Sequence, residues 1–233
     1  MEAKALLQGK LEGMDLNIVD FSKCGLGPAD MSAVVNVLKH APNLNTLLIT
    51  HNDIGLFGCK EVLTLLQNFG NKLTKLDLTF NSIGDEEAKY ICEALRHENC
   101  KLTQLDLTTN NIGDEEAKYI CEALRHENCK LTHLNMSDNY MGDEGAKYIG
   151  NEGAKYIGEV LSHENCKLTH LNISNNNIGD EGEKYICEEL RHENCKLTQL
   201  DISFNYIGDE EAKYIEKVVF LTSEQFRDFA ILV

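Results

Sequence analysis

The chain has 233 residues, 42% of them hydrophobic, which is enough apolar material to bury a sizeable core. Its net charge of -16 argues against nucleic acid and anionic lipid surfaces as partners, because both attract clustered Lys and Arg. A protein partner with a basic patch, or no partner, suits this charge better.

The sequence also indicates a reducing, cytoplasmic environment. "MEAKALLQGKLEG" lacks an apolar core of signal-peptide length, and no run of about 18 apolar residues could span a membrane. The nine cysteines are odd in number, and no secretion signal accompanies them. We therefore expect free thiols rather than a disulfide scaffold.

Residues 16–221 form an array of repeats. "KLTKLDLTFNSIGDEEAKYICEALRHENC", residues 72–100, is nearly identical to residues 101–129, at a spacing of 29. Repetition at about 20 to 50 residues indicates a solenoid. A degenerate first unit begins at Leu16, which predicts seven strand-bearing units, and residues 1–15 are the expected N-terminal cap over the apolar end of the array. The leading leucines of the later units are Leu44, Leu73, Leu102, Leu131, Leu168 and Leu197.

Each unit divides into a strand half and a helix half. The leucines of "LTKLDL" alternate with polar residues, which is the period of a short half-buried strand. In the following "GDEEAKYICEALRHENC", Asp85 is the expected N-cap of a helix. One apolar stripe runs along that helix at Ala88, Ile91, Cys92 and Leu95. Strands and helices that alternate at so short a period predict an α/β solenoid of parallel strands, with helices on the other face.

The fifth unit contains the same eight residues twice, within residues 143–158. "DEGAKYIG" is followed at once by "NEGAKYIG", and residues 154–161 keep the offset of the helix stripe. We predict that the second copy holds the buried stripe, that the first copy bulges out on the helix side, and that the strands stay in register. The bulge is either a tolerated slippage duplication, because surface insertions cost little, or an extra contact surface on the convex edge.

The sixth unit carries Glu183 in the column that holds Ala88 and Ala117. An unpaired buried carboxylate is costly. We therefore expect Glu183 to reach the edge of the stripe and to meet Lys147, Lys155 or water. Simple exposure beside the bulge is the alternative.

Residues 222–233 are the expected C-terminal cap helix. Thr222 and Gln225 have the spacing of a capping box. We predict a helix from about Ser223 that covers the last unit with Phe226, Phe229 and Ile231 or Leu232.

"LxxLxLxxN" followed by "IGDEEA" and "NCKL" resembles the leucine-rich repeat of the ribonuclease-inhibitor type. Similar repeats occur in cytoplasmic immune receptors and in effectors of intracellular bacteria. The resemblance covers about Leu16 to Ile215. It implies a horseshoe with a parallel sheet on the concave face and helices on the convex face. It says less about function, because such a scaffold carries many different sites.

Three kinds of column run through the repeats, and each has a structural interpretation. In this family the Asn after each strand satisfies backbone groups of the turn. The cysteines lack the close pairs that zinc requires, so we interpret them as small buried hydrophobes, with metal binding or a disulfide as the alternative. We expect the histidines of "RHENC" on solvated loops or in local capping, with a metal site as the alternative. The members are Asn52, Asn81, Asn110, Asn139, Asn176 and Asn205; Cys92, Cys121 and Cys187, with Cys100, Cys129, Cys166 and Cys195; and His97, His126, His163 and His192.

The remaining repeat positions should face outward on the concave side of the sheet. We predict that they form a mildly acidic protein-binding surface, with Phe80 and Phe204 as aromatic anchors. A merely solvated sheet face is the alternative. The predicted binding residues are His51, Lys75, Asp77, Phe80, Gln104, Asp106, Thr109, His133, Asn135, Asp138, His170, Asn172, Asn175, Asp201 and Phe204.

We interpret the chain as a protein-binding scaffold with no enzymatic activity, no metal and no cofactor. A nucleophile elbow, a phosphate-binding glycine loop and paired His and Glu at metal spacing are all missing from the sequence. As a monomer, it would inhibit an enzyme or act as a bacterial effector, in the cytoplasm of a bacterium or of a host cell. The alternatives are a GTPase-activating protein, as one relative of this fold is, and a consensus-like array with no evolved partner.

Overall fold

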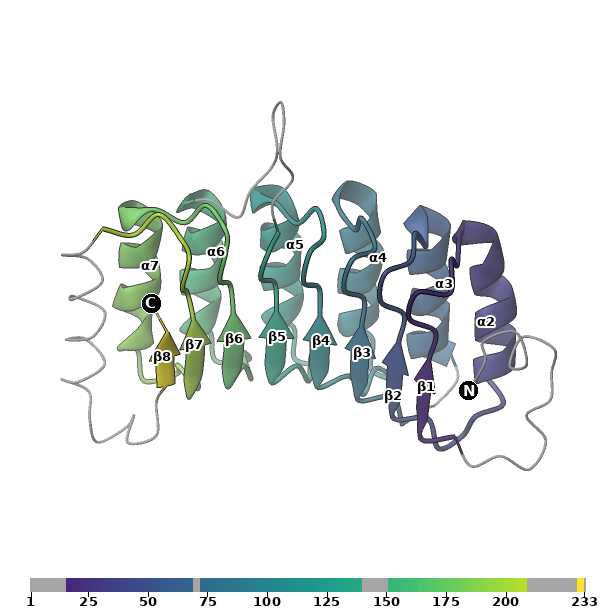
Figure 1. Ribbon diagram of the computed structural model, residues 1–233. Coiled ribbons are helices and arrows are strands. Elements are labelled where there is room, and N and C mark those ends of the chain that lie inside the picture. Colours follow the sequence, from purple (N-terminus) through teal and green to yellow (C-terminus); the bar gives the residue numbers. More distant parts are fainter. Residues whose placement is uncertain (1–15, 69–71, 140–150, 209–229, 233) are drawn as a thin grey trace.

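The computed structural model describes residues 16–68, 72–139, 151–208 and 230–232 (Figure 1). Strands and helices alternate and form two layers, with the helices along one face of a single sheet. The strands are β1 Ile18–Asp20, β2 Thr46–Leu48, β3 Lys75–Asp77, β4 Gln104–Asp106, β5 His133–Asn135, β6 His170–Asn172, β7 Gln199–Asp201 and β8 Ala230–Leu232. The helices are η1 Pro28–Asp30, α2 Met31–Leu38, α3 Gly55–Asn68, α4 Asp85–Leu95, α5 Asp114–Leu124, α6 Asn151–Leu161 and α7 Asp180–Leu190. Within these ranges, no helix is long and apolar enough to cross a membrane.

The strands pair in chain order and all run parallel, from β1 at one edge to β8 at the other. The middle residue of each strand from β1 to β7 points into the core, so that one buried apolar side chain lies opposite the next across the sheet. From β2 to β7 these residues are Leu47, Leu76, Leu105, Leu134, Leu171 and Leu200. The predicted solenoid and its seven strand-bearing units are confirmed.

The helices bury the predicted stripe against the sheet. All four stripe residues of α4 are buried, and so are Leu76 of β3 and Leu78 just after it. The apolar core is one continuous cluster that runs through the described repeats. Burial of apolar surface contributes roughly 25 cal/mol per Å² to the free energy of folding. A single unit would leave the apolar sides that face its two neighbours in water, so each unit depends on those neighbours for its stability.

The aspartate predicted as N-cap is instead the first residue of its helix. Gly84 and Gly113 occupy the N-cap positions, and α4 and α5 begin at Asp85 and Asp114. The Asp114 Oδ1 accepts a hydrogen bond from the Gly153 N–H of the next unit, at 3.0 Å. The acid therefore satisfies an N–H at the start of the neighbouring helix.

The second copy of the doubled segment forms α6, as predicted. Ala154, Ile157 and Leu161 are buried, and β5 and β6 keep the register of the other strands. The second copy continues directly into "EVL", and together they form one unbroken helix. The first copy therefore precedes the start of this helix in the sequence. The first copy, residues 143–150, lies outside the described residues, and so does its expected bulge.

Asn151 takes the place that aspartate holds in other units. Its Oδ1 accepts hydrogen bonds from the N–H groups of Gly179 and Gly182, both at 3.0 Å. The second copy thereby preserves the contact that one unit makes with the next helix start.

Glu183 is fully buried in α7, so the expected position at the edge of the stripe was wrong. The Cys187 thiol, one helical turn away, donates a hydrogen bond to the Glu183 Oε1 at 2.8 Å. The side chain points inward because its column faces the sheet in every unit. Lys155 lies over the ring of Tyr185, 5.9 Å from its centroid, and Lys147 lies outside the described residues.

The loops after the helices confirm the local-capping interpretation of the histidines. His126 Nδ1 accepts the Asn128 N–H at 3.2 Å, and the other three loops repeat this contact. Asn128 Nδ2 then donates to the carbonyl of Arg96, at the end of α4, at 3.1 Å. The equivalent asparagines bond the ends of α3, α5 and α6, so each loop closes the carboxyl end of the helix in the preceding unit.

All nine cysteines are free thiols. Both predicted columns are buried except for the half-buried Cys195, and burial raises the pKa of Cys92 to about 12. In the part of the chain that the structure describes, no group of three or more His, Cys, Asp or Glu residues could hold a metal ion. The thiols pack as small hydrophobes, as predicted.

The asparagine column is confirmed as a structural ladder. Asn110 is buried, and its Oδ1 accepts the N–H groups of Asn81 and Ile83 at 3.0 and 2.9 Å. Its Nδ2 donates to the carbonyls of Leu78 and Leu107, both at 3.0 Å. One carboxamide therefore joins the turns of two consecutive units.

The C-terminal helix predicted for residues 222–233 is replaced at its end by a strand. Ala230–Leu232 form β8, with Ile231 opposite Leu200 of β7. The open edge of β7 offers unpaired N–H and C=O groups, and an apolar segment can satisfy them as a strand but not as a helix. The start of the predicted helix lies outside the described residues, as does the predicted cap at residues 1–15.

Candidate functional site

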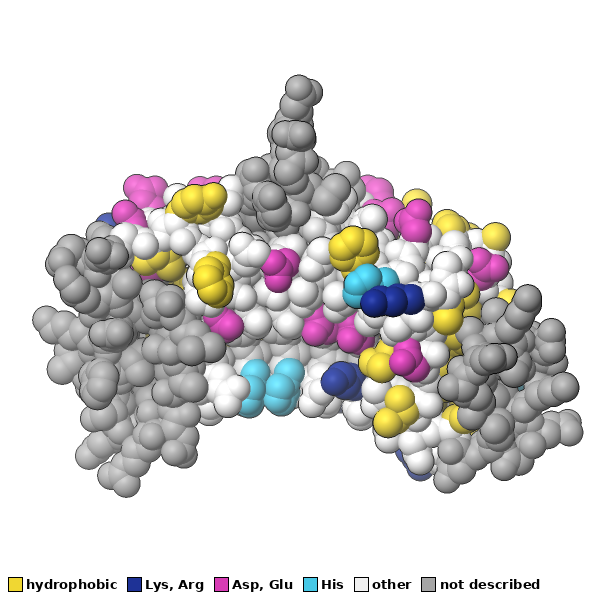
Figure 2. All heavy atoms as spheres, viewed as in Figure 1, with side chains coloured by type: hydrophobic (Ala, Val, Ile, Leu, Met, Phe, Trp, Pro, Cys, Tyr) yellow, Lys and Arg dark blue, Asp and Glu magenta, His cyan; other side chains and the backbone are white. Residues whose placement is uncertain are grey.

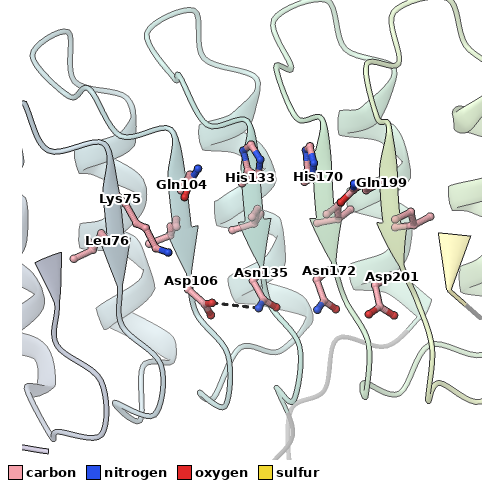
Figure 3. Close-up of a pocket in the computed structure, with 14 residues that line it drawn as sticks. Lys75, Leu76, Gln104, Asp106, His133, Asn135, His170, Asn172, Gln199 and Asp201 are labelled. Atoms are coloured by element: carbon pink, nitrogen blue, oxygen red, sulfur yellow. Dashed lines mark hydrogen bonds between the residues drawn. The ribbon is translucent and has the colours of Figure 1, made fainter. Parts of the chain in front are cut away.

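A groove of about 350 Å³ crosses the face of the sheet opposite the helices, from β3 to β7 (Figure 3). The two end residues of each strand lie on this face of the sheet, because the middle leucine points into the core. We call the first residues of the strands the starting row: Lys75, Gln104, His133, His170 and Gln199. The last residues form the ending row: Asp77, Asp106, Asn135, Asn172 and Asp201. Figure 2 shows acidic and histidine side chains gathered on this hollowed face.

Two histidines lie side by side at the centre of the starting row. His133 on β5 and His170 on β6 stack with their ring centroids 4.0 Å apart and an angle of 17° between the ring planes (Figure 3). Burial first, and then the charge of His170, lower the pKa of His133 below its ordinary value. Both effects favour the neutral imidazole.

The threonine before each histidine holds one nitrogen of its ring. Thr132 Oγ1 lies 2.9 Å from His133 Nδ1 and 3.2 Å from the Thr103 carbonyl, which also accepts the N–H groups of Thr132 and His133. Thr169 Oγ1 likewise lies 2.9 Å from His170 Nδ1 and 3.1 Å from the Thr132 carbonyl. Each ring is therefore anchored at Nδ1 by a threonine hydroxyl.

Side chains of the ending row accept hydrogen bonds from backbone N–H groups of the turns that follow their strands. Asp106 Oδ1 accepts the Thr108 N–H at 2.9 Å and its hydroxyl at 2.5 Å, and Asn135 donates to Asp106 Oδ2 at 3.2 Å (Figure 3). The Asp77, Asn172 and Asp201 side chains each accept an N–H two residues later in the same way. These Asx turns end the strands. The row is therefore a structural feature that also presents carboxylates to the groove.

A third row beside the groove has left-handed backbone. One residue in each turn after the strand has φ between 51° and 58°, a conformation that non-glycine residues rarely adopt. We call these residues the left-handed row: His51, Phe80, Thr109, Asp138, Asn175 and Phe204. Within it, His51 stacks on Phe80 with ring centroids 5.0 Å apart, and Asn175 donates a hydrogen bond to Asp138.

The structure divides the fifteen predicted binding residues into these three rows. Eight of them line the groove, while Asp77 and the whole left-handed row lie outside its lining. The sequence analysis missed Gln199, although its register with Gln104 would have identified it. It also missed Tyr206, which is 75% exposed next to Phe204, and for which the aromatic pair in "FNY" was the available signal.

Comparison with known proteins identifies the repeat. A family model described as "Leucine Rich repeat" matches half of the chain, at residues 71–92, 98–121, 127–150, 164–187 and 193–215. Among solved structures, internalin C2 from Listeria monocytogenes is 18% identical, with 88% of this chain and 73% of that chain covered and a TM-score of 0.44. A leucine-rich repeat protein of Leptospira interrogans is 20% identical, with 84% and 39% covered and a TM-score of 0.46. The leucine-rich repeat domain of APL1B is 15% identical, with 89% and 50% covered and a TM-score of 0.44.

Proposed function

The chain belongs to the leucine-rich repeat family, and from this premise we propose that it is a protein-binding module of the ribonuclease-inhibitor type. The groove and the left-handed row would bind one protein partner that carries a basic patch. Repeats of this family generally serve as scaffolds for protein interaction. The net charge of -16 supports the choice of a basic partner surface.

The strongest support comes from Phe80 and Phe204. Their side chains are 52% and 83% exposed, so they leave large apolar surfaces in water. Their backbones also adopt a positive φ, which costs a bulky residue free energy that Asn or Gly would avoid. Two aromatic residues that are unfavourable on both counts fit a surface that becomes buried against a partner.

We further propose that the bound partner is an enzyme and that binding inhibits it. A partner that lies across β3 to β7 would have its contact surface covered over the width of five strands, and an active site on that surface would be blocked. The nine free thiols support a cytoplasmic location, since oxidising compartments favour disulfides. The free thiols and the binding surface would equally suit a bacterial effector that acts in the cytosol of a host cell. We propose that the unbound protein is a monomer.

The test is affinity capture with matched aromatic variants. The double variant Phe80→Asn/Phe204→Asn removes both anchors and places Asn in a backbone conformation that it tolerates. The control is Phe57→Asn on α3, whose side chain is 47% exposed on the helical side. We expect a protein retained by the wild type and by the control to be lost from the double variant. Equal retention by all three, or no retained protein at all, would refute the proposed surface.

A further inference from the structure

We propose that the left-handed row binds one face of an α-helix of the partner, and that this face carries an apolar, a basic and an apolar residue in that order. Phe80 and Phe204 would each contact one of the apolar residues, and Asp138 would pair with the Arg or Lys between them. This inference rests on the proposed function and specifies which element of the partner the surface receives.

The row is evenly spaced along the sheet because the backbone pairing of the strands continues through it. From His51 to Asn175, the N–H of each row residue donates to a carbonyl of the next turn, at 2.9 to 3.1 Å. His51 and Phe80 come from adjacent turns, and their stacked rings have centroids 5.0 Å apart. That distance agrees with the spacing of about 4.8 Å between neighbouring strands.

The three residues that would contact the partner are therefore equally far apart. Phe80 follows β3, Asp138 follows β5 and Phe204 follows β7, so two strand steps separate each from the next (Figure 1). Two steps amount to roughly 10 Å and four steps to roughly 20 Å. The nearly parallel rings of His51 and Phe80, with 12° between their planes, indicate that side chains of the row project in a common direction.

This spacing matches an α-helix and excludes a β-strand. Residues i, i+7 and i+14 of an α-helix lie on one face, at roughly 10.5 and 21 Å along the axis from the first. An extended strand covers about 10 Å in three residues, and an odd number of residues turns the side chain to the opposite face.

The other two units of the row also match a helix. Helix residues near i+3 or i+4, and near i+10 or i+11, lie on the same face at roughly 5 and 16 Å. Thr109 and Asn175 stand one and three strand steps from Phe80, so each would have a counterpart on the helix. A polyproline helix places one residue on a face about every 9.3 Å and would leave both without a counterpart.

The chemistry of the row sets the order of the residues on the helix. Two exposed aromatic rings stand at its ends, and Asp138 stands halfway between them. The Asp138 side chain is half-buried, and its Oδ1 accepts a hydrogen bond from Asn175, which holds the carboxylate in place. Neither of the ion pairs formed between described residues involves Asp138. A cation of the partner can therefore pair with it, and the net charge of -16 adds to the attraction.

The experiment titrates the full chain with capped helical peptides of 22 residues and follows binding by NMR, which detects millimolar affinities. The first peptide is rich in alanine and glutamine, with leucine at positions 4 and 18 and arginine at position 11. The second moves one leucine from position 18 to position 20, which keeps the composition but turns that leucine to the opposite face. The third has glutamate at position 11. The fourth is a polyproline peptide with leucine, arginine and leucine at every third residue.

We expect the first peptide to bind about tenfold more tightly than the second, because the second loses one leucine contact with an aromatic ring. It should bind about fivefold more tightly than the third, because an attraction to Asp138 becomes a repulsion. Equal binding of the first two peptides, or tightest binding of the polyproline peptide, would overturn the inference.

Single variants assign each preference to its residue. Phe204→Asn should abolish the tenfold preference and keep the fivefold preference for arginine, whereas Asp138→Asn should do the reverse. The controls are Phe57→Asn on α3 and Glu93→Gln on α4, which remove an exposed ring and an exposed carboxylate from the helical side and should change neither preference. A tenfold preference that survives Phe204→Asn would place the leucine contact elsewhere and contradict the inference.

The peptides also separate this inference from the proposed function. If affinity capture fails for Phe80→Asn/Phe204→Asn but the first two peptides bind equally, the binding surface stands and the helix is wrong. If both preferences appear although no protein is captured, the row recognises a helix and the proposed partner is what fails.

Discussion

Replacing Asn110 with alanine tests whether the asparagine ladder holds the turns together. The carboxamide of Asn110 accepts hydrogen bonds from two backbone N–H groups, and its two Nδ2 protons are shared among three carbonyls. The two N–H groups belong to Asn81 and Ile83, which are buried, so alanine would leave both without an acceptor. Each orphaned group costs roughly 1–3 kcal/mol, so we expect the free energy of unfolding to fall by about 4 kcal/mol.

Urea unfolding followed by circular dichroism measures this loss, and the adjacent Asn111→Ala is the matched control. Its side chain is only half-buried, so its loss should change stability by no more than about 0.5 kcal/mol. Asn110→Asp keeps the acceptor but sets a carboxylate against three carbonyl oxygens, and at neutral pH it should destabilise at least as much as alanine. If Asn110→Ala and Asn111→Ala unfold within about 1 kcal/mol of each other, the ladder contributes far less than these hydrogen bonds imply.

Thr109→Asn should stabilise the protein by about 0.5–1 kcal/mol, because Asn adopts the positive φ of this position more readily than a β-branched residue; a lowered melting temperature would contradict this. Titration of the folded protein with a thiol reagent should detect one fast-reacting thiol, that of the exposed Cys24, until urea exposes the other eight. Buried thiols react slowly because burial disfavours the thiolate, and it raises the pKa of Cys59 to about 12. Several fast-reacting thiols before unfolding would show that the core is open. Deletion of residues 143–150 or of residues 151–158 should give two folded proteins of nearly equal stability, because the products differ only by Asn or Asp at the first residue of α6. Urea unfolding that separates the two by more than about 2 kcal/mol would show that this cap position is worth more than an ordinary helix cap.

The fold could be read from the sequence because the periodicity of the apolar residues fixes which side chains face the core. The alternation in "LTKLDL" and the stripe from Ala88 to Leu95 specify a strand and a helix, and identical spacing sets the register. The same reasoning placed the second copy of the doubled segment in the helix. It failed for Ala230–Leu232, because a short apolar segment carries no period that separates strand from helix.

The groove residues were predictable, but their roles were not. Position in the repeat identifies Asp106 as a concave residue, yet only the geometry reveals that one of its oxygens closes an Asx turn. The left-handed backbone of Phe80 and Phe204 leaves no trace in a sequence without glycine at those positions. The threonine hydroxyls that hold His133 and His170 also contact carbonyls of the neighbouring units. Contacts between units, unlike those within a unit, have no local signature.

The hydrogen bonds between units run in two directions, and this restricts how the array can change length. The carbonyl end of each described helix from α3 to α6 is closed by an asparagine of the following unit, such as Asn128. The N–H groups at the starts of α6 and α7 are closed by a residue of the preceding unit, Asp114 or Asn151. Removal of a unit from either end therefore opens one helix end that had been closed. A whole unit of 29 residues inserted between two others receives both closures from its neighbours, so the interior is where such an array gains repeats at least cost.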